Sequence, residues 1–99
     1  MNDTEIVSLY WARSESAIAE SKAKYGAYCL TIARNILGNA QDADEVTADT
    51  WLAAWNSIPP HNPAVLSTYL EKLTRRISLK MLRSRSAQKN PQRSYAIFG

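Results

Sequence analysis

Apolar residues recur every three or four positions through most of this chain, which is the spacing of α-helices rather than of strands. A first helix is expected to begin at Asp3, as its N-cap, and to end at a break near Ser14. A second helix is expected from about Glu15 to Leu37, where Gly38 can take the left-handed conformation that ends a helix. The apolar face of this second helix comprises Ile18, Tyr25, Cys29, Ile32 and Ile36.

A third helix is predicted from about Gln41 to Ile58, and a fourth from Ala64 or Val65 to about Ser86. The segment between them, Pro59 to Pro63, has three prolines in five residues and cannot continue a helix. Its φ angles are largely preset, so it can hold a fixed shape without secondary structure. The apolar face of the third helix comprises Ala43, Val46, Trp51, Ala54, Trp55 and Ile58, and that of the fourth Leu66, Leu70, Leu73, Ile77 and Met81.

These elements predict an all-α domain, a three-to-four-helix bundle with a Pro-rich loop between the last two helices. A chain of 99 residues, 45% of them apolar, has room for one small core. Residues 1–89 are expected to form the domain, and residues 90–99 the start of a linker or a cut end. The single cysteine, Cys29, excludes an internal disulfide framework and a cysteine zinc site. No apolar run reaches the roughly 20 residues that span a bilayer, and the acidic start is no secretory signal, so a cytoplasmic protein without membrane contact is expected.

Charge is distributed unevenly along the chain. Up to Pro60 there are eight acidic and four basic residues, a net charge of −4, whereas from His61 onward there are one acidic and eight basic residues, a net charge of +7. Such asymmetry favours two different partners, of which the one for the basic part is a polyanion. The alternative is a charged C-terminal part that only keeps the chain in solution.

The predicted fourth helix carries a second stripe, centred about 100° from its apolar stripe. It comprises Tyr69, Lys72, Arg76, Lys80 and Arg83. A helix of about 22 residues is about 33 Å long, close to one turn of duplex DNA at about 34–36 Å. The cations can therefore meet successive phosphates, and Tyr69 can stack on a base of a separated strand. The alternative is an ordinary amphipathic helix with solvated Lys and Arg side chains.

The predicted third helix carries an acidic stripe of Asp42, Glu45 and Asp49. This stripe is either a solvated face or a docking face for a basic partner. It does not predict a metal site, because the only histidine, His61, lies beyond the end of the helix. No cofactor is expected. The chain has no P-loop, no GxGxxG, no HExxH and no nucleophile set with room to assemble, so it is not predicted to be an enzyme.

Two stretches, RNILGNAQDADEVTADTWLAAWNSIPP and LSTYLEKLTRRISLKMLRSR, closely resemble region 2 of the sigma factors of bacterial RNA polymerase, and more narrowly the extracytoplasmic-function group. The resemblance extends from about Thr4 to about Ala87. Its specific part is an ordered set of four elements. These are a long helix ending in Leu-Gly, an acidic D-A-x-E-V-x-x-x-T-W-L-x-A-W helix, a Pro-rich loop and a basic helix that opens with Y-L-x-K-L-T-R.

The resemblance implies that the acidic helix docks on the clamp helices of the largest subunit of core RNA polymerase. The matching positions are Glu45, Ala48, where the family often has Gln, and Asp49; Asp42 of the acidic stripe completes the polymerase-binding set. The resemblance also implies that the loop captures a base flipped out of the non-template strand of the minus-ten promoter element. In that loop His61 and Asn62 are the only side chains able to form hydrogen bonds.

In the family the basic helix grips the melted minus-ten element. Tyr69 stands where many members have Trp, Arg76 replaces a frequent Asn, and Lys80 replaces a frequent Asp, which makes this helix more cationic. The expected DNA-binding residues are His61, Asn62, Tyr69, Lys72, Arg75, Arg76, Lys80 and Arg83.

The function expected from this resemblance is promoter recognition and melting, with acidic and basic surfaces on opposite flanks joined by the proline loop. An anti-sigma factor is a further candidate partner. Family members carry a second, helix-turn-helix domain, before which this sequence stops. The alternatives are a helical DNA-binding regulator of another kind and a helical protein-interaction adaptor.

Overall fold

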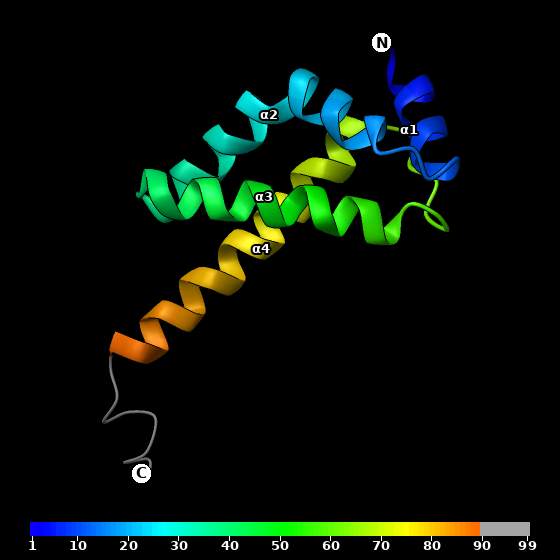
Figure 1. The fold of residues 1–99 in the computed structure, drawn as a ribbon. Helices are drawn as coiled ribbons and strands as arrows, with labels where there is room; N and C mark the ends of the chain where they lie inside the picture. Colours follow the sequence, from blue (N-terminus) through cyan, green and yellow to red (C-terminus); the bar gives the residue numbers. More distant parts are fainter. Residues whose placement is uncertain (90–99) are drawn as a thin grey trace.

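The computed structural model describes residues 1–89, which form four helices (Figure 1). These are α1 (Asp3–Trp11), α2 (Ser16–Leu37), α3 (Ala40–Ser57) and α4 (Leu66–Lys89). The described residues contain no strand, so the predicted all-α bundle is confirmed. The prediction of a linker or cut end concerns residues 90–99, which lie outside the described residues.

Helices α2, α3 and α4 pack against one another, and α1 packs on α2 (Figure 1). Helix α1 and the loop between α3 and α4 lie at the same end of the bundle, while the C-terminal half of α4 extends away from that end (Figure 1). The chain therefore brings its first helix beside the Pro-rich loop, some 50 residues later in the sequence.

The core is built largely from the predicted apolar faces of α3 and α4. On α2 the prediction is only partly right: Cys29 and Ile32 are buried, but Ile18, Tyr25 and Ile36 are half-buried. Tyr10 is fully buried and its hydroxyl lies 2.7 Å from Oγ of Ser21, which joins α1 to α2. Between α3 and α4, the buried hydroxyls of Thr50 and Thr74 lie 3.2 Å apart. The main cluster comprises Ile6, Val7, Tyr10, Ala17, Cys29, Trp51, Ala54, Ile58, Leu66, Leu70 and Leu73.

Gly38 ends α2 as predicted, with φ of 68° and its N–H donating to the carbonyl of Arg34 at 2.7 Å. The predicted cap of α1 is wrong: the N-cap is Asn2 rather than Asp3. Asn2 Oδ1 accepts from the N–H of Glu5 at 2.8 Å, and the Glu5 carboxylate accepts from the N–H of Asn2 at 3.0 Å. Two orphan N–H groups are thereby satisfied reciprocally.

Because Asp3 already lies inside the helix, its side chain reaches α2 instead. Its carboxylate accepts hydrogen bonds from Tyr25 Oη at 2.7 Å and from Lys24 Nζ at 2.7 Å. Burial raises the pKa of Asp3, but the hydrogen bonds from Lys24 and Tyr25 and the charge of Lys24 outweigh it, so the net pKa is lowered. The carboxylate is thus held ionised and paired, and it fixes the start of α1 against α2.

Arg13 connects the corner after α1 to the end of α3. Its guanidinium donates to the carbonyls of Trp55 at 2.9 Å and Ile58 at 2.8 Å, and it lies 3.7 Å from the centre of the Trp55 ring. These carbonyls are among the last of α3, where a cation is favoured. Arg13 therefore fixes the point at which the Pro-rich loop leaves the bundle.

Replacing Arg13 by alanine is expected to lower the free energy of unfolding by about 1.5 kcal/mol, because two charge-assisted hydrogen bonds and a cation–π contact are lost. Arg13→Lys should recover less than half of this, since an ammonium cannot reproduce the planar, two-carbonyl geometry. Urea unfolding followed by circular dichroism measures the difference. An Arg13→Ala variant as stable as the wild type would contradict this role.

Candidate nucleic-acid interface

The cations of the predicted stripe are exposed on one side of α4. Lys72, Arg76, Lys80 and Arg83 are all exposed, and none forms an ion pair among the described residues. At the head of the stripe, the half-buried Tyr69 donates its hydroxyl to Ser57 Oγ at 2.6 Å. This hydrogen bond holds the Tyr69 ring against the end of α3, so the ring has a fixed position at the head of the basic stripe.

Arg75 stands apart from this stripe. It lies about 60° around the helix from Lys72, toward α2, and its Nε donates to Glu71 Oε2 at 2.9 Å. Glu71 Oε1 also accepts from Tyr28 Oη of α2 at 2.8 Å. The hydrogen bonds from Tyr28 and Arg75 hold the pKa of Glu71 below its ordinary value. Arg75 is thus exposed but paired, unlike the other predicted DNA-binding cations.

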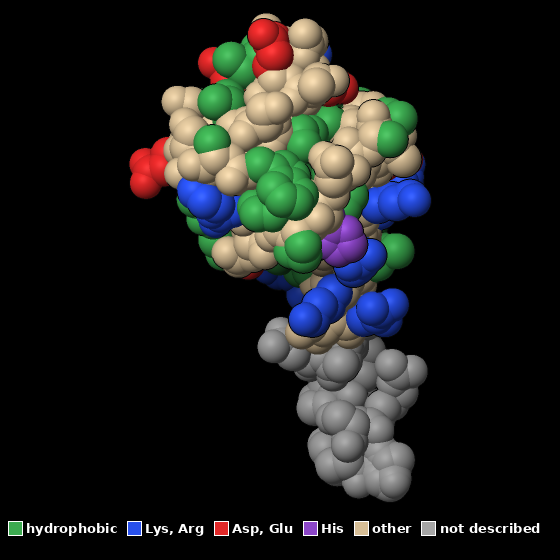
Figure 2. Space-filling view, turned by 90° about the vertical axis from the view of Figure 1, so that its right-hand side faces the viewer, with side chains coloured by type: hydrophobic (Ala, Val, Ile, Leu, Met, Phe, Trp, Pro, Cys, Tyr) green, Lys and Arg blue, Asp and Glu red, His purple; other side chains and the backbone are tan. Residues whose placement is uncertain are grey.

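The loop places its two polar side chains on different sides. The exposed imidazole of His61 lies over Tyr69, with ring centroids 5.8 Å apart and planes tilted by 40°. The backbone N–H of His61 donates to the carbonyl of Ser57 at 2.9 Å, which anchors the loop to α3. Figure 2 shows the chain's single histidine beside a group of Lys and Arg side chains on one face. His61 therefore extends the basic stripe onto the loop.

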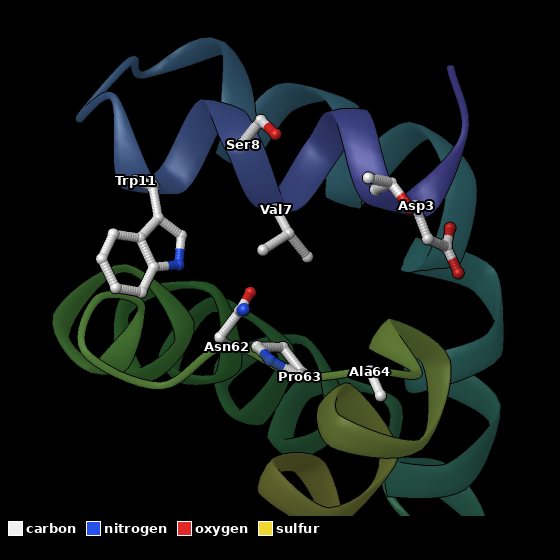
Figure 3. A pocket seen from close by; sticks show the side chains of 8 residues that line it. Asp3, Val7, Ser8, Trp11, Asn62, Pro63 and Ala64 are labelled. Atoms are coloured by element: carbon white, nitrogen blue, oxygen red, sulfur yellow. The ribbon is translucent and has the colours of Figure 1, made fainter.

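Asn62 instead faces α1 across an open pocket of about 740 Å³ (Figure 3). Trp11, which is 47% exposed, stands at one end of this pocket. The sequence reasoning gave Trp11 no role. Its position gave no clear signal, because Trp11 lies about 140° around α1 from Ile6 but only about 40° from Val7, and both of these residues are buried. The lining comprises Asp3, Thr4, Val7, Ser8, Trp11, Asn62, Pro63 and Ala64.

The carboxylates on the acidic face of α3 differ in whether they form ion pairs. Glu45, Ala48 and Asp49 are exposed, and neither carboxylate forms an ion pair among the described residues. Asp42 differs, because its side chain is 14% exposed and lies 2.7 Å from Arg85 of α4. The predicted polymerase-binding set therefore divides into a free pair of carboxylates and one that is already paired within the domain.

Leu52 belongs to the same exposed face of α3 and was missed by the sequence reasoning. It is 56% exposed and follows Ala48 by four residues and Asp49 by three, so the three side chains are neighbours. An apolar residue outside the apolar stripe of an otherwise well-patterned helix was the signal. A face with carboxylates around an exposed leucine has the composition of a protein contact.

The acidic and basic surfaces border each other instead of lying on opposite flanks. A groove of about 570 Å³ between α3 and α4 is lined by Glu45 and Asp49 on one side and by Lys80 on the other, with Ile77 and Met81 among its lining residues. The reason is the packing of α3 against α4, which turns one edge of each charged face toward the same groove.

Within residues 1–89, no group of three or more His, Cys, Asp and Glu side chains is placed to hold a metal ion. In the same part of the chain, none of the helices combines the length and apolar character needed to cross a membrane.

A family model described as sigma-70 region 2 matches residues 23–88, two thirds of the chain. The chain therefore belongs to the sigma-70 region 2 family. It is a domain of a transcription-initiation factor that binds RNA polymerase and promoter DNA, and it is not an enzyme. No curated protein and no solved structure matches the chain. The match begins within α2, so α1 lies outside it.

Proposed function

We propose that this domain is of the extracytoplasmic-function type, and that it recognises and melts the minus-ten promoter element while docked on core RNA polymerase in the cytoplasm. The observation that carries the proposal is the joint placement of the cations of α4 and His61 of the loop, beside an acidic face with two carboxylates that form no ion pair within residues 1–89. Each charged surface suits one of the two partners that a promoter complex contains.

The basic stripe serves the DNA. Lys72, Arg76 and Arg83 neutralise phosphates of the non-template strand and release counterions. Tyr69 and His61 offer aromatic faces at the head of the stripe, where a base that leaves the duplex can stack. Extrusion of a base costs a few kcal/mol, and a loop whose shape is preset loses little entropy when it binds that base.

The exposed face of α3 serves the polymerase. Glu45 and Asp49 attract a basic surface such as the clamp helices of the largest subunit, and Leu52 supplies apolar contact between them. An anti-sigma factor that covers this face would compete directly with polymerase.

The decisive experiment is co-purification of the chain with core polymerase, followed by binding of single-stranded and duplex minus-ten DNA that carries a fluorescent base analogue. The domain is expected to bind core polymerase, to bind the single strand in a salt-dependent manner, and to raise the analogue's fluorescence in the duplex only when polymerase is present. DNA binding without polymerase binding would instead indicate a regulator of another kind. Polymerase binding without DNA binding at low salt would indicate an adaptor.

A further inference from the structure

We infer that Glu71 and Tyr28 are positioning residues, which hold the guanidinium of Arg75 so that it recognises a guanine by hydrogen bonds instead of neutralising a phosphate. The inference rests on the proposed function and deepens it in two ways. It assigns a base preference to one cation of α4, and it gives a role to two residues outside the predicted DNA-binding set.

Glu71 has a charge opposite to that of its surroundings. It is the only acidic residue from His61 to the end of the sequence, a part of the chain with eight basic residues. A carboxylate at this position opposes the attraction of a polyanion to α4. An exposed ion pair between residues four apart on a helix also adds little to stability. Stability and charge attraction are therefore weak reasons for an acid here, and its contacts suggest another role.

The two carboxylate oxygens of Glu71 contact two different helices. Oε1 accepts a hydrogen bond from Tyr28 Oη of α2 at 2.8 Å, and Oε2 accepts one from Arg75 Nε at 2.9 Å. The hydrogen bonds from Tyr28 and Arg75 lower the pKa of Glu71, so the side chain is ionised at neutral pH. Because Tyr28 attaches the carboxylate to α2, Arg75 meets an acceptor that is held in place on its other side.

The outer donors of Arg75 remain available. The bond to Glu71 uses only Nε, and within residues 1–89 neither Nη1 nor Nη2 forms a hydrogen bond. The side chain of Arg75 is 53% exposed, so solvent or a ligand can reach these nitrogens. A guanidinium is planar, and a fixed Nε therefore restricts the plane in which the Nη N–H groups lie. Such a group can donate in parallel to two adjacent acceptor atoms.

Charge decides between the two ligands in DNA that offer paired acceptors. Guanine presents O6 and N7 on one edge, and a phosphate presents two oxygens. Glu71 already balances the charge of Arg75, so a phosphate bound there gains less, whereas hydrogen bonds to an uncharged base need no net charge. Lys72 precedes Arg75 by three residues and forms no ion pair among the described residues, so the two side chains are neighbours on α4. A strand with a phosphate on Lys72 therefore brings a base edge within reach of Arg75.

The first test measures which base the chain prefers at each position of a single strand that the wild type selects from a randomised library. The wild type is expected to favour guanine about tenfold at one position, the range of a bidentate arginine contact. At that position 7-deazaguanine, which lacks the N7 acceptor, should remove most of the preference, whereas inosine, which keeps O6 and N7, should bind as guanine does. Arg75→Lys should lose the preference, because an ammonium lacks the two-nitrogen fork.

The second test separates positioning from a structural role. Glu71→Gln keeps the shape but removes the charge, so the guanine preference should fall below about threefold while the slope of log K against log salt rises by up to about 0.7, the contribution of one phosphate contact. A loss of structure would instead weaken selectivity and affinity together. Tyr28→Phe removes only one hydroxyl and should lower the preference about threefold with the slope unchanged. Glu15→Gln makes the same charge change at the exposed N-cap of α2 and should change neither quantity.

Helical content by circular dichroism identifies any variant that fails to fold, and Tyr28→Phe, which keeps every carbon atom, then decides the result alone. The positioning role is overturned if Glu71→Gln and Tyr28→Phe both keep the wild-type preference. Recognition of guanine by Arg75 is overturned if wild-type binding is salt-dependent but no guanine preference depends on Arg75. Absence of any strand binding at low salt would overturn the proposed DNA function itself.

Discussion

Replacing both Glu45 and Asp49 by lysine is expected to lower the affinity for core RNA polymerase at least 100-fold. The two carboxylates are exposed and unpaired within the described part of the chain, so in the complex they are available to a basic partner. Lysine at both positions converts attraction into like-charge repulsion, which costs several kcal/mol across an interface, and 100-fold corresponds to about 2.7 kcal/mol. Affinity capture with a titrated concentration of polymerase measures the loss.

The chain offers a matched control for this prediction. Glu15 is exposed at the N-cap of α2, on another helix than Glu45. Glu15→Lys and Glu45→Lys change the net charge equally, yet only Glu45→Lys should weaken polymerase binding strongly. Equal losses would mean that general charge, and not this face of α3, attracts the polymerase. Single-strand DNA binding should be kept or slightly strengthened by Glu45→Lys, because Lys80 faces the same groove.

The second large effect is expected from Lys72→Ala combined with Arg76→Ala, which should weaken single-strand DNA binding about 50-fold at 50 mM salt. Each phosphate contact on a single strand contributes a slope of about 0.7 in log K against log salt, or about eightfold at that concentration. The double variant should therefore reduce the slope by about 1.4. Fluorescence anisotropy over a range of salt concentrations measures both quantities, and an unchanged slope would refute the proposed contacts.

Two further variants serve as controls for the change in the salt slope. Arg34→Ala removes an exposed cation in the last turn of α2, at the end of that helix away from the loop, and should leave the slope unchanged. Arg75→Ala should lower the slope by less than half of a full contact, because Glu71 already holds its guanidinium at 2.9 Å. If Arg75→Ala instead matches Arg76→Ala, the ion pair with Glu71 opens when DNA binds.

The sequence predicts where charged residues lie along a helix, but not which of them are paired with residues of another helix. The spacing of Lys72, Arg75 and Arg76 along one helix was sufficient to predict a basic helix. The spacing already left Arg75 out of the basic stripe, and Glu71, four residues before it, is a local partner. The sequence did not show that Tyr28 of α2, 43 residues before Glu71, also holds the Glu71 carboxylate in place. Asp42 and Arg85 likewise meet only because α3 packs along α4.

The sequence by itself determined the helices, the stop at Gly38, the position of the Pro-rich loop and the segregation of acidic from basic residues. These features depend on interactions between residues within about one helical turn of each other, so the local sequence is enough to predict them. Only the tertiary structure decided which carboxylates stay free, that the two charged faces share a groove, and that Trp11 and Asn62 face one pocket. These depend on how α1, α3 and α4 pack, which brings together residues up to about 50 positions apart that no periodicity connects.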